Sequence, residues 1–193
     1  MSADTPLLLA STSPRRAALL TAAGIAFEVE EPGVDEALVG DPIASPSRRA
    51  VVLALAKARA VAARHPGRIV VGADTLVVVD AESLGKPRDA AEALWMLSRL
   101  SGATHEVVTG VAVVGPGGEE AAGFATTLVE FGRWPAAALR AAAASPSVLD
   151  KAGAYGIQEV AGAYVVRLAG AQDNVAGLPV WLVRRLLGRL PGA

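Results

Sequence analysis

Apolar residues in this chain follow two patterns. Some form short continuous runs, and others recur singly every three or four positions. Short runs rich in aliphatic and β-branched residues predict strands at 7–10, 27–30, 69–80, 106–114, 123–131 and 164–168. Helical spacing and helix-start signals predict helices at 14–24, 45–65, 89–100, 134–144 and about 180–190. The turn Gly115-Pro-Gly-Gly118 predicts that the strands on either side of it form an antiparallel hairpin.

Composition limits the classes of protein that this chain can belong to. With 193 residues, 52% of them hydrophobic, it is too apolar for disorder and is expected to form a single domain over 1–193. Eighteen basic and nineteen acidic residues give a net charge of −1, which argues against a broad nucleic-acid or membrane surface. The absence of cysteine excludes disulfides, thiolate catalysis and zinc–thiolate sites. The two histidines, His65 and His105, are too few and too unsupported to indicate a metal site or a catalytic base.

Targeting signals are not evident in the sequence. No stretch approaches the roughly eighteen apolar residues that a membrane span requires. Residues 1–6 lack a basic segment, and the apolar run 7–10 is too short for a signal peptide. The protein is therefore expected to be cytoplasmic.

One carboxylate, Asp74, stands inside the long apolar run 69–80. An unbroken run predicts a strand covered on both faces, with Asp74 at or near the strand end. A buried carboxylate needs a cation, a metal ion or a shifted pKa, which points to function. A turn aspartate that caps the following residues fits the spacing equally well. Gly72 would allow a ligand or a second backbone to approach closely.

The predicted helix at 14–24 begins with an arrangement suited to anions. Ser13 suits the N-cap and Pro14 the first helical position. Arg15 and Arg16 follow in the first turn, where positive charge opposes the helix dipole and so does not serve helix stability. Together with free backbone N–H groups and nearby hydroxyls, they predict a phosphate site. A pair of solvated surface arginines is the alternative.

Lysines occur in two further places of interest. Lys57 lies between apolar neighbours on a predicted helix, where a lysine commonly extends from the rim of the core into solvent. Lys86 lies between glycine and proline on a loop, which suits contact with a phosphate. The glycine-rich segment 151–158 carries Lys151, Tyr155 and Gln158, which together could bind a ligand.

Six short motifs follow one another along the chain. They are S-T-S-P-R-R at 11–16, G-A-D-T at 72–75, G-K-P at 85–87, L-S-G-x-x-H-x-V-x-T at 100–109, D-K-A-G-A-Y-G-I-Q at 150–158 and N-V-x-G-L-P at 174–179. This order resembles the Maf family of nucleoside triphosphate pyrophosphatases, over about residues 7–187. The resemblance implies a mixed α/β fold with an elongated central sheet flanked by helices, and two lobes with a cleft, similar to inosine triphosphate pyrophosphatase. It also implies cleavage between the α and β phosphates.

The resemblance also implies roles for individual residues. It places the catalytic proton acceptor at Asp74, and a divalent cation, Mg²⁺ or Mn²⁺, at Glu36 and Asp74. The substrate-binding residues that it implies are Ser13, Arg15, Arg16, Glu36, Lys57, Thr75, Lys86 and Gln158. The implied partner is a nucleoside triphosphate, with no nucleic acid and no membrane, and the family often forms homodimers.

Within the family, Arg16, Thr75 and Gln158 resemble the branch that acts on dTTP and UTP. The family usually has glycine after I-Q, whereas this chain has Glu159. If that glycine takes a positive φ, Glu159 must strain or shift the backbone, and the position of Gln158 would change. A broad-specificity or 7-methyl-GTP pyrophosphatase, and a non-hydrolytic nucleotide-binding regulator of cell division, are the alternatives.

Overall fold

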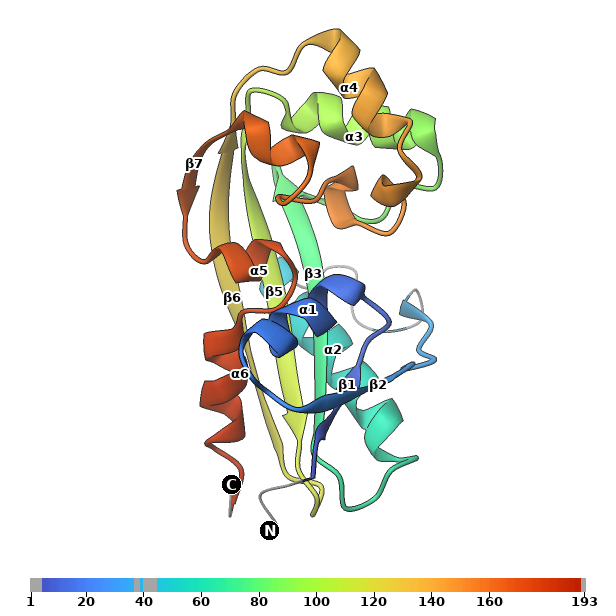
Figure 1. Ribbon diagram of the computed structural model, residues 1–193, viewed down its shortest axis with the longest axis vertical. Coiled ribbons are helices and arrows are strands. Elements are labelled where there is room, and N and C mark those ends of the chain that lie inside the picture. Colours follow the sequence, from blue (N-terminus) through green and yellow to red (C-terminus); the bar gives the residue numbers. More distant parts are fainter. Residues whose placement is uncertain (1–4, 37–38, 40–44, 192–193) are drawn as a thin grey trace. The chain divides into compact units, whose positions relative to one another are not determined.

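The computed structural model describes residues 5–36, 39 and 45–191. Parts of the predictions for the N-terminus (residues 1–4) and for the loop after Glu30 (residues 37, 38 and 40–44) lie outside the described residues. The strands are β1 Leu7–Ala10, β2 Phe27–Glu30, β3 Val70–Val79, β4 Glu82–Leu84, β5 Thr104–Val114, β6 Glu120–Phe131 and β7 Val165–Ala169 (Figure 1). The α-helices are α1 Pro14–Ala22, α2 Pro46–Ala62, α3 Ala90–Leu100, α4 Ala136–Ala143, α5 Gln172–Val175 and α6 Val180–Leu187. Short 3₁₀ helices are η2 Pro146–Val148, η3 Ala152–Ala154 and η4 Val160–Tyr164.

The strands among the described residues form one mixed sheet. Its order is β2-β1-β3-β5-β6-β7, and β4 pairs with β3. Strand β1 is parallel to β2 and β3, whereas the β3–β4 and β6–β7 pairs are antiparallel. The mixed α/β class expected from the sequence is confirmed.

Strand β3 differs from the prediction at its centre. It runs from Val70 through Asp74 to Val79, so the expectation that Asp74 lies at or near a strand end is wrong. The physical reason is that the β-branched run continues beyond Asp74, where Val77 to Val79 pair with β4. The N-V-x-G-L-P motif begins inside a helix, because α5 extends to Val175.

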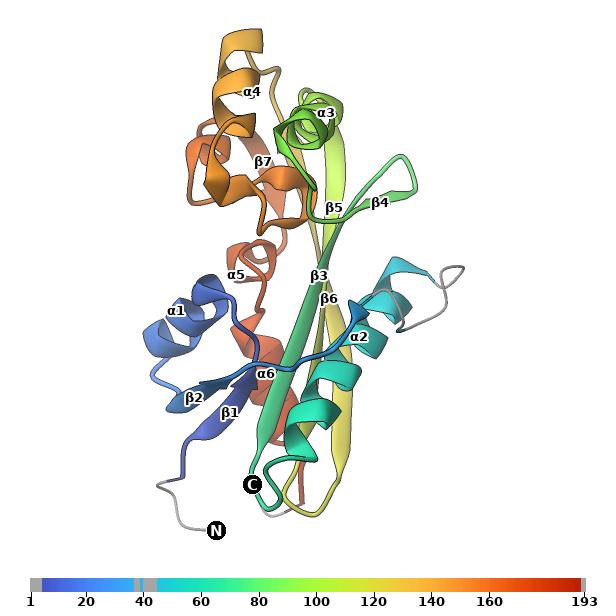
Figure 2. The ribbon, with the colours of Figure 1, turned by 90° about the vertical axis from the view of Figure 1, so that its right-hand side faces the viewer.

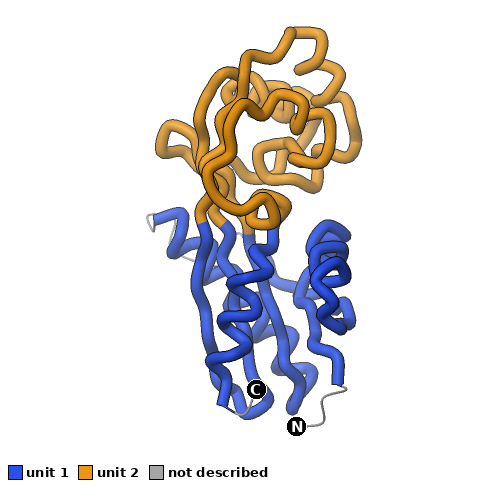
Figure 3. The backbone as a smooth tube through the Cα atoms, turned by 60° about the vertical axis from the view of Figure 1, so that its left-hand side comes forward, with its two compact units in different colours: residues 1–74, 109–125, 177–193 blue, residues 75–108, 126–176 orange. Residues whose placement is uncertain are grey.

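The chain divides into two compact units, shown in different colours in Figure 3. The first contains residues 1–74, 109–125 and 177–193, and the second contains residues 75–108 and 126–176. Each of β3, β5 and β6 has residues in both units. Within the described part of the chain, no helix is both long and apolar enough to cross a membrane.

In the first unit, helix α2 packs directly on the backbone of the sheet (Figure 2). A Cβ on Gly72 of β3 would lie 2.3 Å from the carbonyl oxygen of Ala54, and one on Gly110 of β5 would lie 2.3 Å from that of Ala50. Glycine at these positions lets a helix that presents alanines approach the strands closely. The second backbone allowed by Gly72 is therefore that of α2.

The second unit has an aromatic core. Phe131 contacts the rings of His105, Trp134 and Tyr155, with centroid distances of 5.0, 5.4 and 5.1 Å. These four side chains are at least nine-tenths buried. They pack with aliphatic residues of α3 and β3 and with the 3₁₀ segments.

Candidate active site

A buried lysine joins two carboxylates in the first unit. The Nζ of Lys57 donates to Oδ1 of Asp74 at 2.6 Å and lies 2.7 Å from Oε1 of Glu36. The side chains of Lys57 and Asp74 are 7% and 8% exposed, whereas that of Glu36 is 43% exposed. The result is a buried ion pair with a second carboxylate at its solvent-facing end.

The local sequence explains how this cluster forms. Asp74 lies on β3 two residues after Gly72, where α2 approaches the strand. Lys57 lies on α2 between the buried residues Ala54 and Ala58, which pack against the same sheet. Because α2 is this close to β3, the lysine side chain meets the strand carboxylate instead of bulk water.

This geometry corrects one interpretation of the sequence. Lys57 does not extend from the rim of the core into solvent, because its ammonium group ends on Asp74 and Glu36. Two carboxylates thus meet at one lysine cation. Such a cluster can hold a further cation, and it can orient a water molecule through a carboxylate oxygen.

Arg16 is tied to two separate segments of the first unit. Its Nε donates to the carbonyl oxygen of Gly177 at 2.8 Å, and its Nη1 donates to Oγ of Ser11 at 3.0 Å. Burial lowers the pKa of Arg16 below its ordinary value, whereas the negative charges of Asp74 and Glu36 act in the opposite direction. Arginine side chains remain cations in proteins. The helix-start arginine is therefore held in place and experiences the carboxylate cluster electrostatically.

The start of α1 agrees with part of the phosphate-site prediction. Ser13 occupies the N-cap position with Pro14 after it, but its side chain makes no capping hydrogen bond to the described residues of α1. The Ser13 amide instead donates to Oγ of Ser11 at 3.2 Å. Arg15 is half-buried beside Arg16, and its charge contributes to the lowered pKa of that neighbour.

The remaining predicted site residues belong to the second unit. Thr75 follows Asp74 on β3 and is half-buried, and Lys86 and Gln158 are exposed. The loop that carries Lys86 contacts the glycine-rich segment, because the amide of Gly153 donates to the carbonyl oxygen of Gly85 at 3.0 Å. The G-K-P and D-K-A-G-A-Y-G-I-Q motifs are therefore neighbours within this unit.

Two residues of the glycine-rich segment have partners inside the protein. Lys151 is 4% exposed, and its Nζ lies 3.0 Å from Asp150 and 2.9 Å from Glu159. The hydroxyl of Tyr155 is 2.7 Å from Nε2 of buried His105, and burial raises the pKa of this tyrosine. These interactions support a structural role for Lys151 and Tyr155. Gln158, by contrast, is exposed to solvent.

Sequence reasoning missed the part that Gly177 has in the site. Its carbonyl oxygen holds Arg16, although the two residues are 161 positions apart. The N-V-x-G-L-P motif contains this glycine, so the motif was the available signal. A backbone acceptor leaves no side-chain pattern, and its role could not be read from residue types.

The donor set agrees with a magnesium-type cation that completes its shell with substrate. Among the described residues, no group of three or more histidine, cysteine, aspartate or glutamate residues could hold a metal ion. Glu36 and Asp74 supply two carboxylates. Mg²⁺ commonly binds through one or two carboxylates, water and phosphate oxygens. The residues present fit such an ion without forming a full protein cage.

Comparison with known proteins gives consistent matches along the chain. Residues 6–190 match the family described as Maf-like protein. A dTTP/UTP pyrophosphatase of Symbiobacterium thermophilum is 51% identical over 90% of this chain and 88% of its own length. One of Geotalea uraniireducens is 44% identical over 98% of this chain and 97% of its own.

Two solved structures show a weaker likeness. One is a nucleoside-triphosphatase (dITP/XTP pyrophosphatase) from Mycobacterium abscessus, with a TM-score of 0.42 and 23% identity, covering 68% of this chain and 75% of that one. The other is the Ham1 protein of Staphylococcus aureus, with a TM-score of 0.45 and 17% identity, covering 66% of this chain and 72% of that one.

Proposed function

Because this chain belongs to the Maf-like protein family, we propose that it hydrolyses nucleoside triphosphates to the nucleoside monophosphate and pyrophosphate. The names of its relatives support dTTP and UTP as substrates. The observation that carries the proposal is the buried Lys57–Asp74 ion pair, which also meets the partly exposed carboxylate of Glu36. A purely structural core would gain little from a lysine and two carboxylates, because burial of charge opposes folding.

The arginines are proposed to bind the phosphate chain. A triphosphate carries several negative charges, and guanidinium groups and helix N-terminal amides are suited to them. Arg16 is already oriented by Ser11 and Gly177, so less conformational entropy is lost when it meets a phosphate. Arg15 lies in the same helical turn. We assign Ser13 to the same phosphate-binding helix start.

Asp74 is proposed to accept the proton of the attacking water. Its Oδ1 is engaged by Lys57, which fixes the orientation of the carboxylate. A positioned carboxylate can take the proton as the water oxygen attacks phosphorus and the bond between the α and β phosphates breaks. Lys57 then has a positioning role toward Asp74, in addition to any contact with substrate.

Glu36 and Asp74 would hold the divalent cation, Mg²⁺ or Mn²⁺. When bound, such an ion polarises phosphate oxygens and neutralises their charge. Carboxylate oxygens are ligands that Mg²⁺ prefers in proteins. Thr75, Lys86 and Gln158 are proposed as further substrate-binding residues.

The experiment is a nucleotide panel with the purified protein and magnesium. The panel contains UTP, dTTP, CTP, ATP, GTP and 7-methyl-GTP, and the assay measures pyrophosphate and orthophosphate separately. We expect pyrophosphate from UTP and dTTP, at rates above those for ATP and GTP. Omission of magnesium, with a chelator present, should abolish release.

Each alternative gives a different result in this panel. Release of orthophosphate would refute cleavage between the α and β phosphates. Equal rates on purine nucleotides, or fastest turnover of 7-methyl-GTP, would refute the substrate preference and leave the reaction intact. Tight nucleotide binding without any turnover would refute the enzyme and support a nucleotide-binding regulator.

A further inference from the structure

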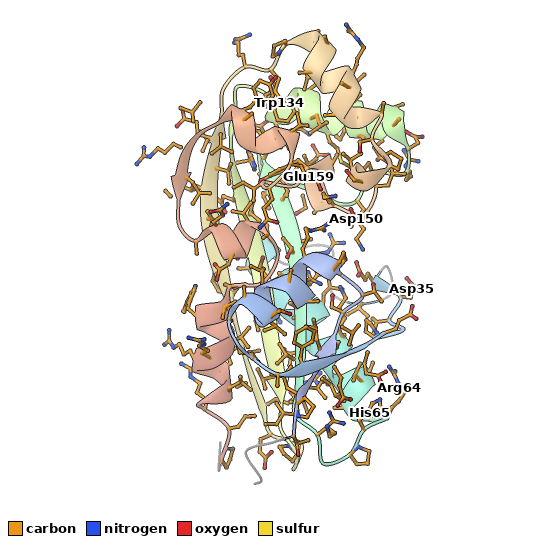
Figure 4. The ribbon with its side chains drawn as sticks, in the orientation of Figure 1. Asp35, Arg64, His65, Trp134, Asp150 and Glu159 are labelled. Carbon is orange, nitrogen blue, oxygen red and sulfur yellow. The ribbon has the colours of Figure 1, made fainter. Side chains whose placement is uncertain are left out.

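Glu159 links two neighbouring segments of the second unit. Its Oε1 lies 2.9 Å from Nζ of buried Lys151, and its Oε2 accepts a hydrogen bond from the hydroxyl of Ser147 at 3.2 Å. The same Lys151 ammonium donates to the carbonyl oxygen of Ser147 and to Asp150. Figure 4 labels Asp150 and Glu159, the two carboxylates that meet at this lysine.

The backbone at Glu159 does not have the positive φ considered in the sequence analysis. Its φ is −107° and its ψ is −158°, an extended conformation that any residue adopts. The strain expected from a positive φ therefore does not arise at Glu159. The position tolerates a side chain, and this chain uses it for an ion pair.

Gly156 makes room for that ion pair. A Cβ on this glycine would lie 3.0 Å from Cε of Lys151 and 3.1 Å from Cδ of Glu159. The turn is closed by backbone hydrogen bonds from the amide of Glu159 to Gly156 and from the amide of Gly162 to Glu159, at 3.0 and 2.9 Å. The lysine and the glutamate thus meet directly beside the turn that contains exposed Gln158.

The other support for this turn is incomplete. Gly156, Glu159 and Val160 border an apolar cavity of about 360 Å³ whose remaining walls include alanines of α4. The turn is therefore not packed against side chains along this border. Ile157 anchors the turn in the core before Gln158, whereas after Gln158 the ion pair of Glu159 precedes the next buried residue, Ala161.

We propose that Glu159 is a positioning residue whose ion pair with Lys151 fixes the turn 156–162 and so sets the placement of Gln158 for nucleotide discrimination. The inference rests on the proposed function for its link to discrimination. The structural part of the inference, that Glu159 orders the turn 156–162, does not depend on activity. Glu159 itself need not touch the nucleotide.

Asp150 offers a matched control within the same cluster. Asp150 and Glu159 lie at 3.0 and 2.9 Å from the same ammonium, with side chains 52% and 42% exposed. Asp150 is adjacent to Lys151 in the chain, and only Glu159 lies on the turn with Gln158. Glu159→Gln and Asp150→Asn therefore remove comparable charges with different consequences for the turn.

The first measurement is backbone amide exchange and ¹⁵N relaxation of the ligand-free protein. We expect faster exchange and greater mobility at residues 157–160 in Glu159→Gln, and wild-type behaviour there in Asp150→Asn. Unchanged mobility in Glu159→Gln, or an equal change in both variants, would overturn the positioning role. Because no substrate is present, this result stands even if the wild type proves inactive, which would refute only the proposed function.

The second measurement compares kcat/KM for UTP and for GTP in the same variants. We expect Glu159→Gln to lower kcat/KM for UTP by about threefold to tenfold, mainly through KM, with little change for GTP. Gln158→Ala should also lower the ratio of kcat/KM for UTP to kcat/KM for GTP. The double variant should lower this ratio no further. An equal loss on both nucleotides, or an unchanged ratio, would mean that Glu159 has no part in discrimination.

Discussion

Asp74 combines two properties that seldom occur together in a residue of purely structural role. It is 5% exposed in the middle of a strand, and its charge is compensated by a lysine that is shared with a second carboxylate. Buried charges are tolerated when they are paired and hydrogen-bonded. The arrangement holds a carboxylate at a fixed position, which is what a proton acceptor requires.

Asp74→Asn tests this reading with the smallest change available. Asparagine keeps the size and one acceptor oxygen for Lys57 but loses charge and basicity, so turnover should fall by about 10² or more. Nucleotide affinity should survive. The melting temperature should change little, because Glu36 still compensates the lysine. Pyrophosphate release, nucleotide affinity and thermal unfolding measure the three effects.

Asp80→Asn is the matched control for that substitution. Asp80 directly follows the same strand but is exposed and pairs with Arg99 instead of Lys57. Its φ of 50° suits asparagine as well as aspartate. Kinetics should therefore match the wild type. An Asp74→Asn variant with normal turnover would move the proton acceptor to Glu36 or elsewhere.

Single residues also show which parts of the site can be predicted from sequence and which cannot. The apolar run around Asp74 indicates a buried carboxylate that needs a partner, and this is confirmed. The partner, Lys57, could not be identified from its neighbours in the sequence. A lysine between apolar residues on a helix shows the same pattern whether it pairs inside the core or lies at the rim of the core. Its contact depends on how closely α2 approaches β3, which is a tertiary property.

At the scale of elements, the docking of α2 is decided by two glycines in neighbouring strands. Gly72 and Gly110 bring strand backbone against Ala54 and Ala50 of the helix. This close approach is what carries Lys57 to Asp74. The alanines and glycines are visible in the sequence, but their pairing is set by the order of the strands, in which β1 and β5 flank β3.

Gly110→Ala should therefore destabilise the first unit. The new Cβ would lie 2.3 Å from backbone atoms of Ala50, which cannot rotate away as a flexible side chain could. Overpacking of this kind costs about 1–3 kcal/mol or more. The free energy of unfolding from urea titration measures the loss.

Gly188→Ala provides the comparison for that glycine. Its Cβ would meet backbone atoms only at 3.6 Å, an ordinary contact, and its φ of −68° suits alanine. Stability should stay the same or rise by a few tenths of a kcal/mol. If both alanine variants were equally stable, close docking of α2 on β5 would be contradicted.

At the scale of the whole molecule, most strands and helices follow from local pattern, and the assembly of the site does not. The predicted strands at 7–10 and 27–30 coincide with β1 and β2, because short β-rich runs bounded by turns leave few alternatives. By contrast, Arg16 meets Gly177 across 161 positions. Such a contact depends on the tertiary arrangement of the first unit.

The buried His105–Tyr155 pair predicts how stability of the protein varies with pH. Burial lowers the pKa of His105 from 6.5 to about 4, so the folded protein keeps this ring neutral. Its Nδ1 has no hydrogen-bond partner among the described residues, so a proton there would be buried without an acceptor. The unfolded chain binds that proton near pH 6.5. Between about pH 6.5 and 4 the unfolded state therefore binds more protons, and stability falls as pH decreases.

The full loss should approach about 3 kcal/mol at pH 4, from a difference of roughly 2.5 pKa units at 1.36 kcal/mol each. Above pH 6.5 this contribution is complete and no longer changes. Urea unfolding followed by tryptophan fluorescence at intervals from pH 4 to 8 measures the slope.

His105→Phe removes the titrating group and should flatten the curve in this window, although the unpartnered Tyr155 hydroxyl lowers stability at every pH. His65→Gln, which removes a histidine whose side chain is 31% exposed and lies 3.6 Å from Glu30, should retain the slope. A wild-type slope in His105→Phe would assign the pH dependence to carboxylates instead of to the buried histidine.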